Sequence, residues 1–265
     1  MAPLVCEFAA FNTVNRVSAW AVEAGALDEV RALCAHYERL FSRTDPASQL
    51  ARLNSAGGQP VEVDAELAAL ISQALRYCEA SGGLYDLTMG AVVRLYDFKR
   101  QRLPPQRQVA EALGHVDYRG VEVEGRVVRL RDPLAAIDLG GIAKGYIADR
   151  IVETLAGRGA TSALVNLGGS IAALGAKPDG CAWRLGLRRP LSSFDQPQPE
   201  SFAVVEVRDR SIATSGIYER SFERQGRLYH HILDPRNGRP AATDLLSASV
   251  IAQRALDADG YSTAL

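Results

Sequence analysis

The sequence predicts an α+β fold, because its helical patterns concentrate in the first third and its strand patterns in the second half. Apolar residues recur at helical spacing over 26–42 and 64–83. From residue 120 onwards, short segments alternate apolar and polar residues between turns that contain glycine. A doubly wound parallel sheet would require strands and helices in regular alternation, and the chain lacks that alternation.

The expected helices are delimited by residues that cap or stop them. Asp64 is placed to cap a helix over 64–83, and the glycine pair at its end stops it. Asp45 and Pro46 predict a helix start within 45–58. A helix from about 142 to 156 repeats an apolar residue every fourth position, which gives it one buried face. That face consists of Ala143, Ile147, Ile151 and Leu155.

The expected strands are short. Residues 120–132 predict a hairpin that turns at Glu124 and Gly125, and residues 135–138 predict a short buried strand. A last helix is possible over 254–265. Further strands are expected within 162–176 (two strands around a glycine turn), 183–189, 202–208, 211–216, 221–234 and 245–252.

The composition is that of an ordinary globular protein. Of 265 residues, 47% are hydrophobic and 23% charged, and the net charge of −1 gives no basic excess that would favour nucleic acid. The four cysteines are scattered without metal-binding spacing. No apolar run reaches the roughly 18–20 residues of a membrane span, so no transmembrane segment is expected.

The first residues decide the expected compartment. They lack the basic start and long apolar core of a signal peptide. The sequence as written is therefore expected to be cytoplasmic, or periplasmic if an export signal has been removed.

The stretch DLGGIAKGYIAD, residues 138–149, suggests an anion site. A lysine in the first turn of a helix is unfavourable unless a negative group lies nearby, and Lys144 stands there. The two glycines would let backbone amides approach a phosphate. The stretch fits neither the Walker A pattern nor G-x-G-x-x-G, and a structural glycine turn explains it equally well. Asp138 suits a sugar hydroxyl, a ring N–H, a metal or a helix cap.

Two pairs of oxygen-bearing residues could bind a ligand or metal. Asp259 and Thr263 are four residues apart, so they share a helix face and offer the hard oxygen ligands that Mg²⁺ accepts. A surface aspartate with a threonine bonded back to its own helix is the alternative. Asp86 and Thr88 would share a face if their segment were extended, which is a weak signal alone.

Residues 226–240 contain two adjacent histidines. A histidine suits general base catalysis near neutral pH. Because neighbouring strand residues point to opposite faces, only one of His230 and His231 can serve a given site. A histidine satisfied by hydrogen bonds at a sheet edge is the alternative.

Seven segments together resemble the ApbE-like FAD:protein FMN transferases. They occur in that family's order and approximate spacing, from about residue 8 to the end of the chain. The segments are FSRTDPASQLARLN, GGLYDLTMGAVV, IDLGGIAKGYIADRIVE, LVNLGGSIAALG, IATSGIYERSF, YHHILDPRNGRP and SVIAQRALDADGYSTAL. The resemblance implies that residues 1–265 form one α+β domain with two lobes and a cleft between them that binds FAD. The sequence does not locate the boundary between the lobes.

The activity that the resemblance implies is protein flavinylation. With Mg²⁺ as cofactor, the family transfers the FMN half of FAD to a threonine of an acceptor protein and releases AMP. Two alternatives stay open at this point, an FAD pyrophosphatase that gives FMN and AMP and an FAD-binding carrier without chemistry. The pair of Asp259 and Thr263 argues against the carrier, because binding alone requires no metal ligands.

The resemblance also implies residue roles. His231 matches the histidine of an H-I-x-D-P motif and becomes the candidate base, with His230 as second choice. Phe11 lies where many members have Met-Gly-Thr, and Thr44 replaces a tyrosine that often stacks on the flavin. The other implied FAD contacts are Leu84, Tyr85, Asp86, Asp138, Lys144 and Leu233. The implied metal ligands are the carbonyl of Gly141, Asp259, Thr263 and Ser262, which in some members is acidic.

Overall fold

A computed structural model describes residues 2–23, 25–190 and 201–265, and these divide into two compact units. Unit 1 comprises the described residues of 1–36, 144–216 and 246–262, and unit 2 comprises those of 37–143, 217–245 and 263–265. Helices and mainly antiparallel strands occur in both units, which confirms the predicted α+β class. Within the described part of the chain, no helix is both long and apolar enough to cross a membrane.

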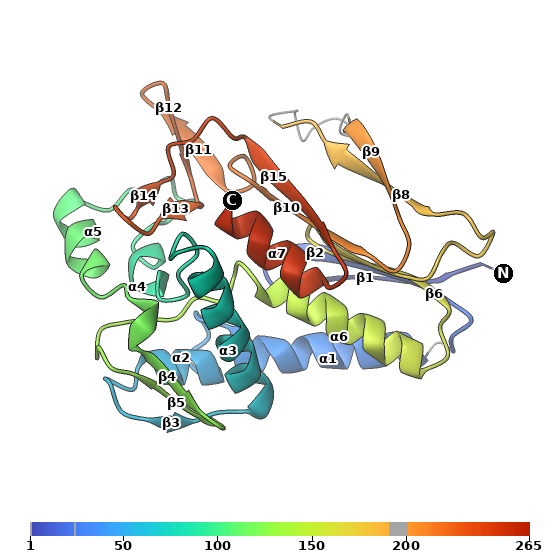
Figure 1. The fold of residues 1–265 in the computed structure, drawn as a ribbon, viewed down its shortest axis with the longest axis horizontal. Coiled ribbons are helices and arrows are strands. Elements are labelled where there is room, and N and C mark those ends of the chain that lie inside the picture. Colours follow the sequence, from blue (N-terminus) through green and yellow to red (C-terminus); the bar gives the residue numbers. More distant parts are fainter. Residues whose placement is uncertain (1, 24, 191–200) are drawn as a thin grey trace. The chain divides into compact units, whose positions relative to one another are not determined.

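Unit 1 is built on a six-stranded antiparallel sheet in the order β1-β2-β6-β7-β10-β15 (Figure 1). The glycines at 168 and 169 have φ of 57° and 97° and form the predicted turn between β6 and β7. The strands are β1 (Leu4–Ala10), β2 (Thr13–Trp20), β6 (Ser162–Leu167), β7 (Ser170–Leu174), β10 (Ser211–Gly216) and β15 (Ser247–Ala252).

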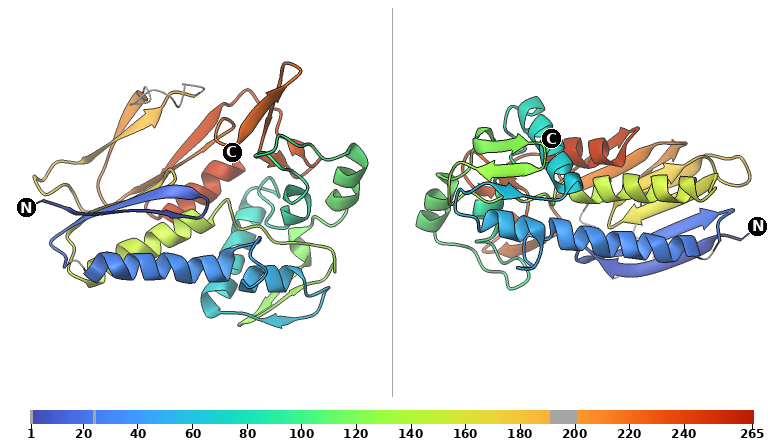
Figure 2. Two further views of the ribbon diagram at one scale, coloured as in Figure 1. Left: turned by 180° about the vertical axis from the view of Figure 1, so that it is seen from behind. Right: turned by 90° about the horizontal axis from the view of Figure 1, so that it is seen from below.

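Three helices cover one face of this sheet (Figures 1 and 2). They are α1 (Gly25–Phe41), α6 (Ala143–Gly157) and α7 (Ala255–Ala264). Of the predicted buried face of α6, Ile147, Ile151 and Leu155 are buried, and Ala143 is partly buried. Other side chains of the sheet pack with Trp183 and Leu185, which belong to a separate hairpin. That hairpin consists of β8 (Trp183–Arg188) and β9 (Ser201–Val207). The hydrophobic core of unit 1 is therefore built around this sheet.

The hairpin of β1 and β2 was not predicted. Its turn consists of Phe11 and Asn12, whose φ values of 56° and 59° are those of a type I′ turn. Asparagine adopts a positive φ readily, but phenylalanine is unusual there. The turn lacks the glycine that normally indicates such a hairpin in a sequence.

Unit 2 contains a three-stranded sheet, β3-β5-β4, and the helices α2 to α5. Asp64 caps α3 by accepting a hydrogen bond from the Glu66 N–H at 2.8 Å, and glycines with positive φ follow the helix, as predicted. The predicted hairpin of 120–132 is present as β4 and β5. The elements are α2 (Gln49–Asn54), β3 (Val61–Glu62), α3 (Ala65–Ala80), α4 (Gly90–Val93), α5 (Gln106–Leu113), η1 (Tyr118–Gly120), β4 (Val121–Glu124) and β5 (Val127–Leu130).

Two expectations for unit 2 were wrong. Helix α2 is capped by Ser48, whose Oγ accepts from the Ala51 N–H at 3.0 Å, and so it begins after the expected Asp45 and Pro46. Residues 135–137 are buried, but 135–138 form no strand apart from one bridge between Ala136 and Met89. The side-chain amide of Asn54 bonds both the N–H and the carbonyl of Ile137, at 2.7 and 2.9 Å, and replaces a strand partner.

Two small hairpins complete unit 2. They are β11 (Ser221–Arg224) with β12 (Arg227–His230), and β13 (Leu233–Asp234) with β14 (Arg239–Pro240). Phe222 stacks on Tyr229 and also contacts Phe98, which ties the first hairpin to the loop after α4. Tyr96 of that loop donates a hydrogen bond to the Gly238 carbonyl at 2.8 Å and anchors the second hairpin.

Candidate active site

Asp138 lies just before the glycine turn of the DLGG stretch and is held in one orientation. Its Oδ1 accepts from the Gly140 N–H at 2.7 Å, and its Oδ2 pairs with Nε of Arg43 at 2.8 Å. Its own N–H donates to the Leu87 carbonyl at 2.8 Å. The carboxylate is thus a fixed acceptor beside a cation, with lone pairs left for a ligand. Sequence reasoning missed Arg43, because nothing local connects it with Asp138.

Asp86 is bound mainly by its own segment. Its Oδ1 accepts from both the N–H and the hydroxyl of Thr88, at 2.7 and 2.6 Å, and its Oδ2 accepts from the Tyr118 N–H at 3.1 Å. The segment is a turn, so the condition for a shared extended face is not met. Next to it, Leu84 is exposed and Tyr85 is buried. Of these three predicted flavin contacts, Leu84 is the one that offers an exposed side chain.

Gly141 and Thr263 are brought together in unit 2. The Thr263 hydroxyl donates to the Gly141 carbonyl at 3.2 Å. A Cβ at position 141 would lie 3.0 Å from the Tyr85 ring and 3.1 Å from the Thr263 methyl carbon. The glycine therefore allows a close approach that presents its carbonyl oxygen beside a hydroxyl oxygen.

Asp259 is a buried carboxylate of unit 1, with a side chain only 6% exposed. Its Oδ1 accepts from the Ser170 hydroxyl at 2.9 Å and lies 3.4 Å from Nζ of Lys144. Its Oδ2 accepts from the Gly145 N–H at 2.9 Å. Ser262, one turn further along α7, is also buried and bonds its hydroxyl to the Asp259 carbonyl at 3.0 Å. These donors compensate the cost of burying the charge of the Asp259 carboxylate.

Lys144 lies in the first turn of α6, where the sequence suggested a bound anion such as phosphate. In the structure its Nζ lies beside the carboxylate of Asp259, and the lysine side chain remains 26% exposed. Contact between Lys144 and a phosphate of FAD stays a prediction. Ser170 was missed as a partner of Asp259, although it follows the glycine pair of the NLGGSIA segment.

The predicted metal ligands are chemically suited to Mg²⁺. All are oxygen donors: one carboxylate, two hydroxyls and one carbonyl, from Asp259, Ser262, Thr263 and Gly141. Among the described residues, no three His, Cys, Asp or Glu side chains gather into a metal-binding group. One carboxylate with neutral oxygens fits a cation that keeps several waters and takes other ligands from substrate phosphates.

The two histidines have different surroundings in unit 2. His230 ends β12 and is buried, with its Nε2 3.2 Å from the Ala241 carbonyl. Burial lowers the pKa of His230 below its ordinary value. His231 lies just after the strand and is partly exposed, and its N–H donates to the Arg220 carbonyl at 3.1 Å. The environment of His230 is that of a structural histidine, which leaves His231 as the candidate base.

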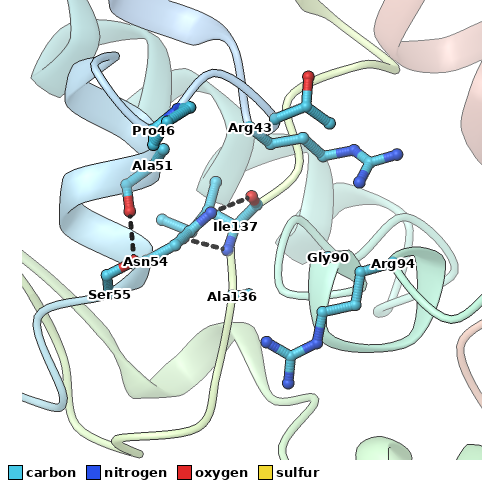
Figure 3. A pocket seen from close by; sticks show the side chains of 10 residues that line it. Arg43, Pro46, Ala51, Asn54, Ser55, Gly90, Arg94, Ala136 and Ile137 are labelled. Atoms are coloured by element: carbon cyan, nitrogen blue, oxygen red, sulfur yellow. Dashed lines mark hydrogen bonds between the residues drawn. The ribbon is translucent and has the colours of Figure 1, made fainter.

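A pocket of about 250 Å³ lies in unit 2 (Figure 3). Thr44 is one of its lining residues. Arg43 and Arg94 also line it, and Asn54 holds the backbone of Ile137 in its wall. The complete lining is Arg43, Thr44, Pro46, Ala51, Asn54, Ser55, Gly90, Arg94, Ala136 and Ile137. Its volume is below the roughly 300–1,000 Å³ of typical ligand pockets, so it could hold a part of a dinucleotide at most.

Two further predicted FAD contacts, Phe11 and Leu233, are not among the residues that line this pocket. Phe11 is in the β1–β2 turn of unit 1 and is partly exposed. Leu233 begins β13 in unit 2 and packs against the cluster of Met89, Val92 and Val109.

Comparisons with known proteins agree with the motifs. A curated FAD:protein FMN transferase of Treponema pallidum (strain Nichols) is 42% identical over 257 residues, which cover 90% of this chain and 70% of the relative. Another, of Klebsiella pneumoniae (strain 342), is 33% identical over 238 residues, with coverage of 88% and 72%.

Solved structures show the same fold. The crystal structure of the ApbE protein of Thermotoga maritima MSB8 matches with a TM-score of 0.89 at 30% identity, over 99% of this chain and 85% of that one. The apo flavinyl transferase ApbE of Pseudomonas stutzeri matches with a TM-score of 0.86 at 26% identity, over 99% and 83%. The sequence model of the ApbE family matches residues 11–265. This chain therefore belongs to the ApbE family.

Proposed function

We propose that this chain, which its family places among the FAD:protein FMN transferases, transfers the FMN half of FAD to a threonine of an acceptor protein in a reaction that requires Mg²⁺. The observation that carries the proposal is the match of the ApbE family model to residues 11–265. The ligand cleft between two lobes that the resemblance implies belongs to the same proposal and stays a prediction.

The proposed reaction exchanges a phosphoanhydride bond for a phosphate ester bond. The threonine hydroxyl oxygen forms a bond to the phosphorus on the FMN side of the pyrophosphate, and the bond from that phosphorus to the AMP oxygen breaks. The hydroxyl proton passes to a base. AMP leaves, and the acceptor keeps FMN as a phosphodiester.

The oxygen donors of helix α7 and Gly141 support the metal part of the proposal. Asp259 and Thr263 are four residues apart on one helix, so both can face one ion. Bound Mg²⁺ would neutralise the charge that develops on the pyrophosphate and steady the AMP leaving group. Lys144, already beside Asp259, supplies a further cation for a phosphate.

His231 is the proposed base. It is partly exposed in unit 2, whereas His230 is buried and bonded to a backbone carbonyl. A neutral imidazole can accept the hydroxyl proton near neutral pH. We expect His231→Ala to lower the transfer rate while FAD binding is retained, and His230→Ala to act mainly on stability.

The experiment that tests the function uses an acceptor protein that has a flavinylation threonine, together with its Thr→Val variant. Purified protein is incubated with FAD and with or without Mg²⁺. AMP release and flavin fluorescence that survives denaturing electrophoresis are then followed. Mg²⁺-dependent fluorescence on the acceptor, absent from the Thr→Val variant, is the expected result.

Other outcomes would select another function. AMP and free FMN at the same rate without any acceptor would indicate an FAD pyrophosphatase. FAD binding with neither product would indicate a carrier. Equal labelling with and without Mg²⁺ would refute the metal requirement alone.

A further inference from the structure

Helix α6 supplies the N-terminal cap of helix α7. Asp149 of α6 accepts hydrogen bonds from the first two N–H groups of α7, with Oδ1 2.7 Å from Ala255 N and Oδ2 3.0 Å from Leu256 N. These N–H groups have no acceptor within their own helix. Arg254, the residue just before α7, has no acceptor in its side chain and cannot cap the helix. The cap therefore comes from another part of the chain.

The cap is a buried one. The Asp149 side chain is 12% exposed, and Nε of Arg254 is 3.8 Å from its Oδ2. Burial raises the pKa of Asp149, while the two backbone donors act in the opposite direction. At this buried position, the Asp149 carboxylate therefore acts as the acceptor for the two α7 N–H groups.

A second contact between the two helices lies one turn earlier on α6. Gly145 is four residues before Asp149, so both lie on the same face of the helix. A Cβ at position 145 would lie 2.3 Å from the Ala255 carbonyl oxygen and 2.8 Å from the Asp259 Cβ. The absence of a side chain thus lets α6 approach α7 closely, and the Gly145 N–H reaches the Asp259 carboxylate.

We propose that Asp149 is a positioning residue for the metal-binding end of α7. By capping the helix, it fixes the start of α7 against α6 and so sets where the Asp259 carboxylate lies. Helix α7 has only 10 residues and carries Asp259, Ser262 and Thr263, so a shift at its start is passed to all three. This inference rests on the Mg²⁺ site of the proposed function.

The test measures Mg²⁺ binding itself, by calorimetric titration of the FAD-free and FAD-loaded protein. Partners that orient metal ligands typically contribute about 10–100-fold to metal affinity, and we expect the Mg²⁺ dissociation constant of Asp149→Ala to rise in that range. Asp149→Asn should lie between the wild type and Asp149→Ala, because an amide oxygen replaces only one of the two acceptors.

The chain offers a matched control and a second variant. Asp64→Ala removes the cap of α3 in unit 2, whose acceptor bond to the Glu66 N–H is 2.8 Å, and should leave Mg²⁺ affinity unchanged. Gly145→Ala keeps the Asp149 carboxylate but should also weaken Mg²⁺ binding, because its methyl group pushes the two helices apart. Gly145→Ala also provides the test if Asp149→Ala does not fold. Denaturant unfolding of every variant shows which ones are folded.

The outcomes separate this proposal from the proposed function. If folded Asp149→Ala and Gly145→Ala bind Mg²⁺ as the wild type does, the positioning role is wrong while the metal site stands. Equal weakening by Asp64→Ala and Asp149→Ala would show a general loss of stability and also overturn it. A wild-type protein that binds no Mg²⁺ in either state would overturn the metal site and this inference together.

Discussion

Replacing Asp259 separates its part in the fold from its proposed part in metal binding. In Asp259→Ala, the N–H of Gly145 and the hydroxyl of Ser170 lose a buried acceptor. A buried donor left without a partner costs about 1–3 kcal/mol, so the two together predict a loss of about 2–6 kcal/mol in the free energy of unfolding. The lost pair with Lys144 adds little, because the lysine is partly exposed.

Asp259→Asn is the matched substitution. Its amide oxygen can still accept one of the two hydrogen bonds, and Ser170 can turn its hydroxyl to accept from the amide nitrogen. The expected loss of unfolding free energy is therefore smaller, about 1–2 kcal/mol. The negative charge that would bind Mg²⁺ at the proposed site is nevertheless gone. Both variants should lose Mg²⁺-dependent AMP release, although only the alanine variant is strongly destabilised.

Two assays decide the matter. Urea unfolding gives the free energies, and AMP release from FAD is followed across a range of Mg²⁺ concentrations. Wild-type AMP release by Asp259→Asn at saturating Mg²⁺ would refute the metal role. An alanine variant as stable as the asparagine variant would refute the reasoning about the buried hydrogen bonds.

Three further predictions concern other residues. Lys144→Ala should weaken FAD binding more than riboflavin binding, because riboflavin has no phosphate; equal losses in a fluorescence titration would exclude a phosphate contact. Thr44→Tyr should lower the dissociation constant of FAD about 3- to 10-fold by restoring a stacking ring, and an unchanged constant would place the flavin elsewhere. The lowered pKa of His230 means that stability is full above about pH 6.5, the unfolded value, and falls as the pH drops through the folded value, because the unfolded state binds the proton more readily. His230→Asn should remove that slope from pH-dependent urea unfolding, and a slope that persists would assign it to another group.

Elements with a local signal could be predicted from the sequence. The bounds of α3 follow from a capping aspartate at one end and two glycines at the other. The buried face of α6 follows from an apolar residue at every fourth position. Gly141 and Thr263 could be grouped only through the resemblance to a family, because the two residues are far apart in the chain.

Features that depend on distant partners could not be predicted. Asp138 gave no sign that Arg43 would pair with it. Residues 135–138 are apolar enough for a strand, but the amide of Asn54 occupies the backbone groups that a neighbouring strand would bind. The β1–β2 hairpin turns at Phe11 and Asn12 without a glycine, so the usual turn signal is missing. In each of these cases, a distant side chain or an unusual turn residue determines the local structure.

The DLGGIAKGYIAD stretch changes its meaning when these contacts are taken together. From the sequence it suggested a loop that cradles phosphate, with the lysine as its cation. In unit 1, three of its residues contact helix α7 instead: Lys144 through its charge, Gly145 through its N–H and lack of a side chain, and Asp149 through the helix cap. A phosphate loop requires only backbone and one cation. A stretch that also fixes a neighbouring helix and its carboxylate is better explained as the support of the helix that carries the proposed metal ligands, and contact between its partly exposed lysine and a phosphate stays a prediction.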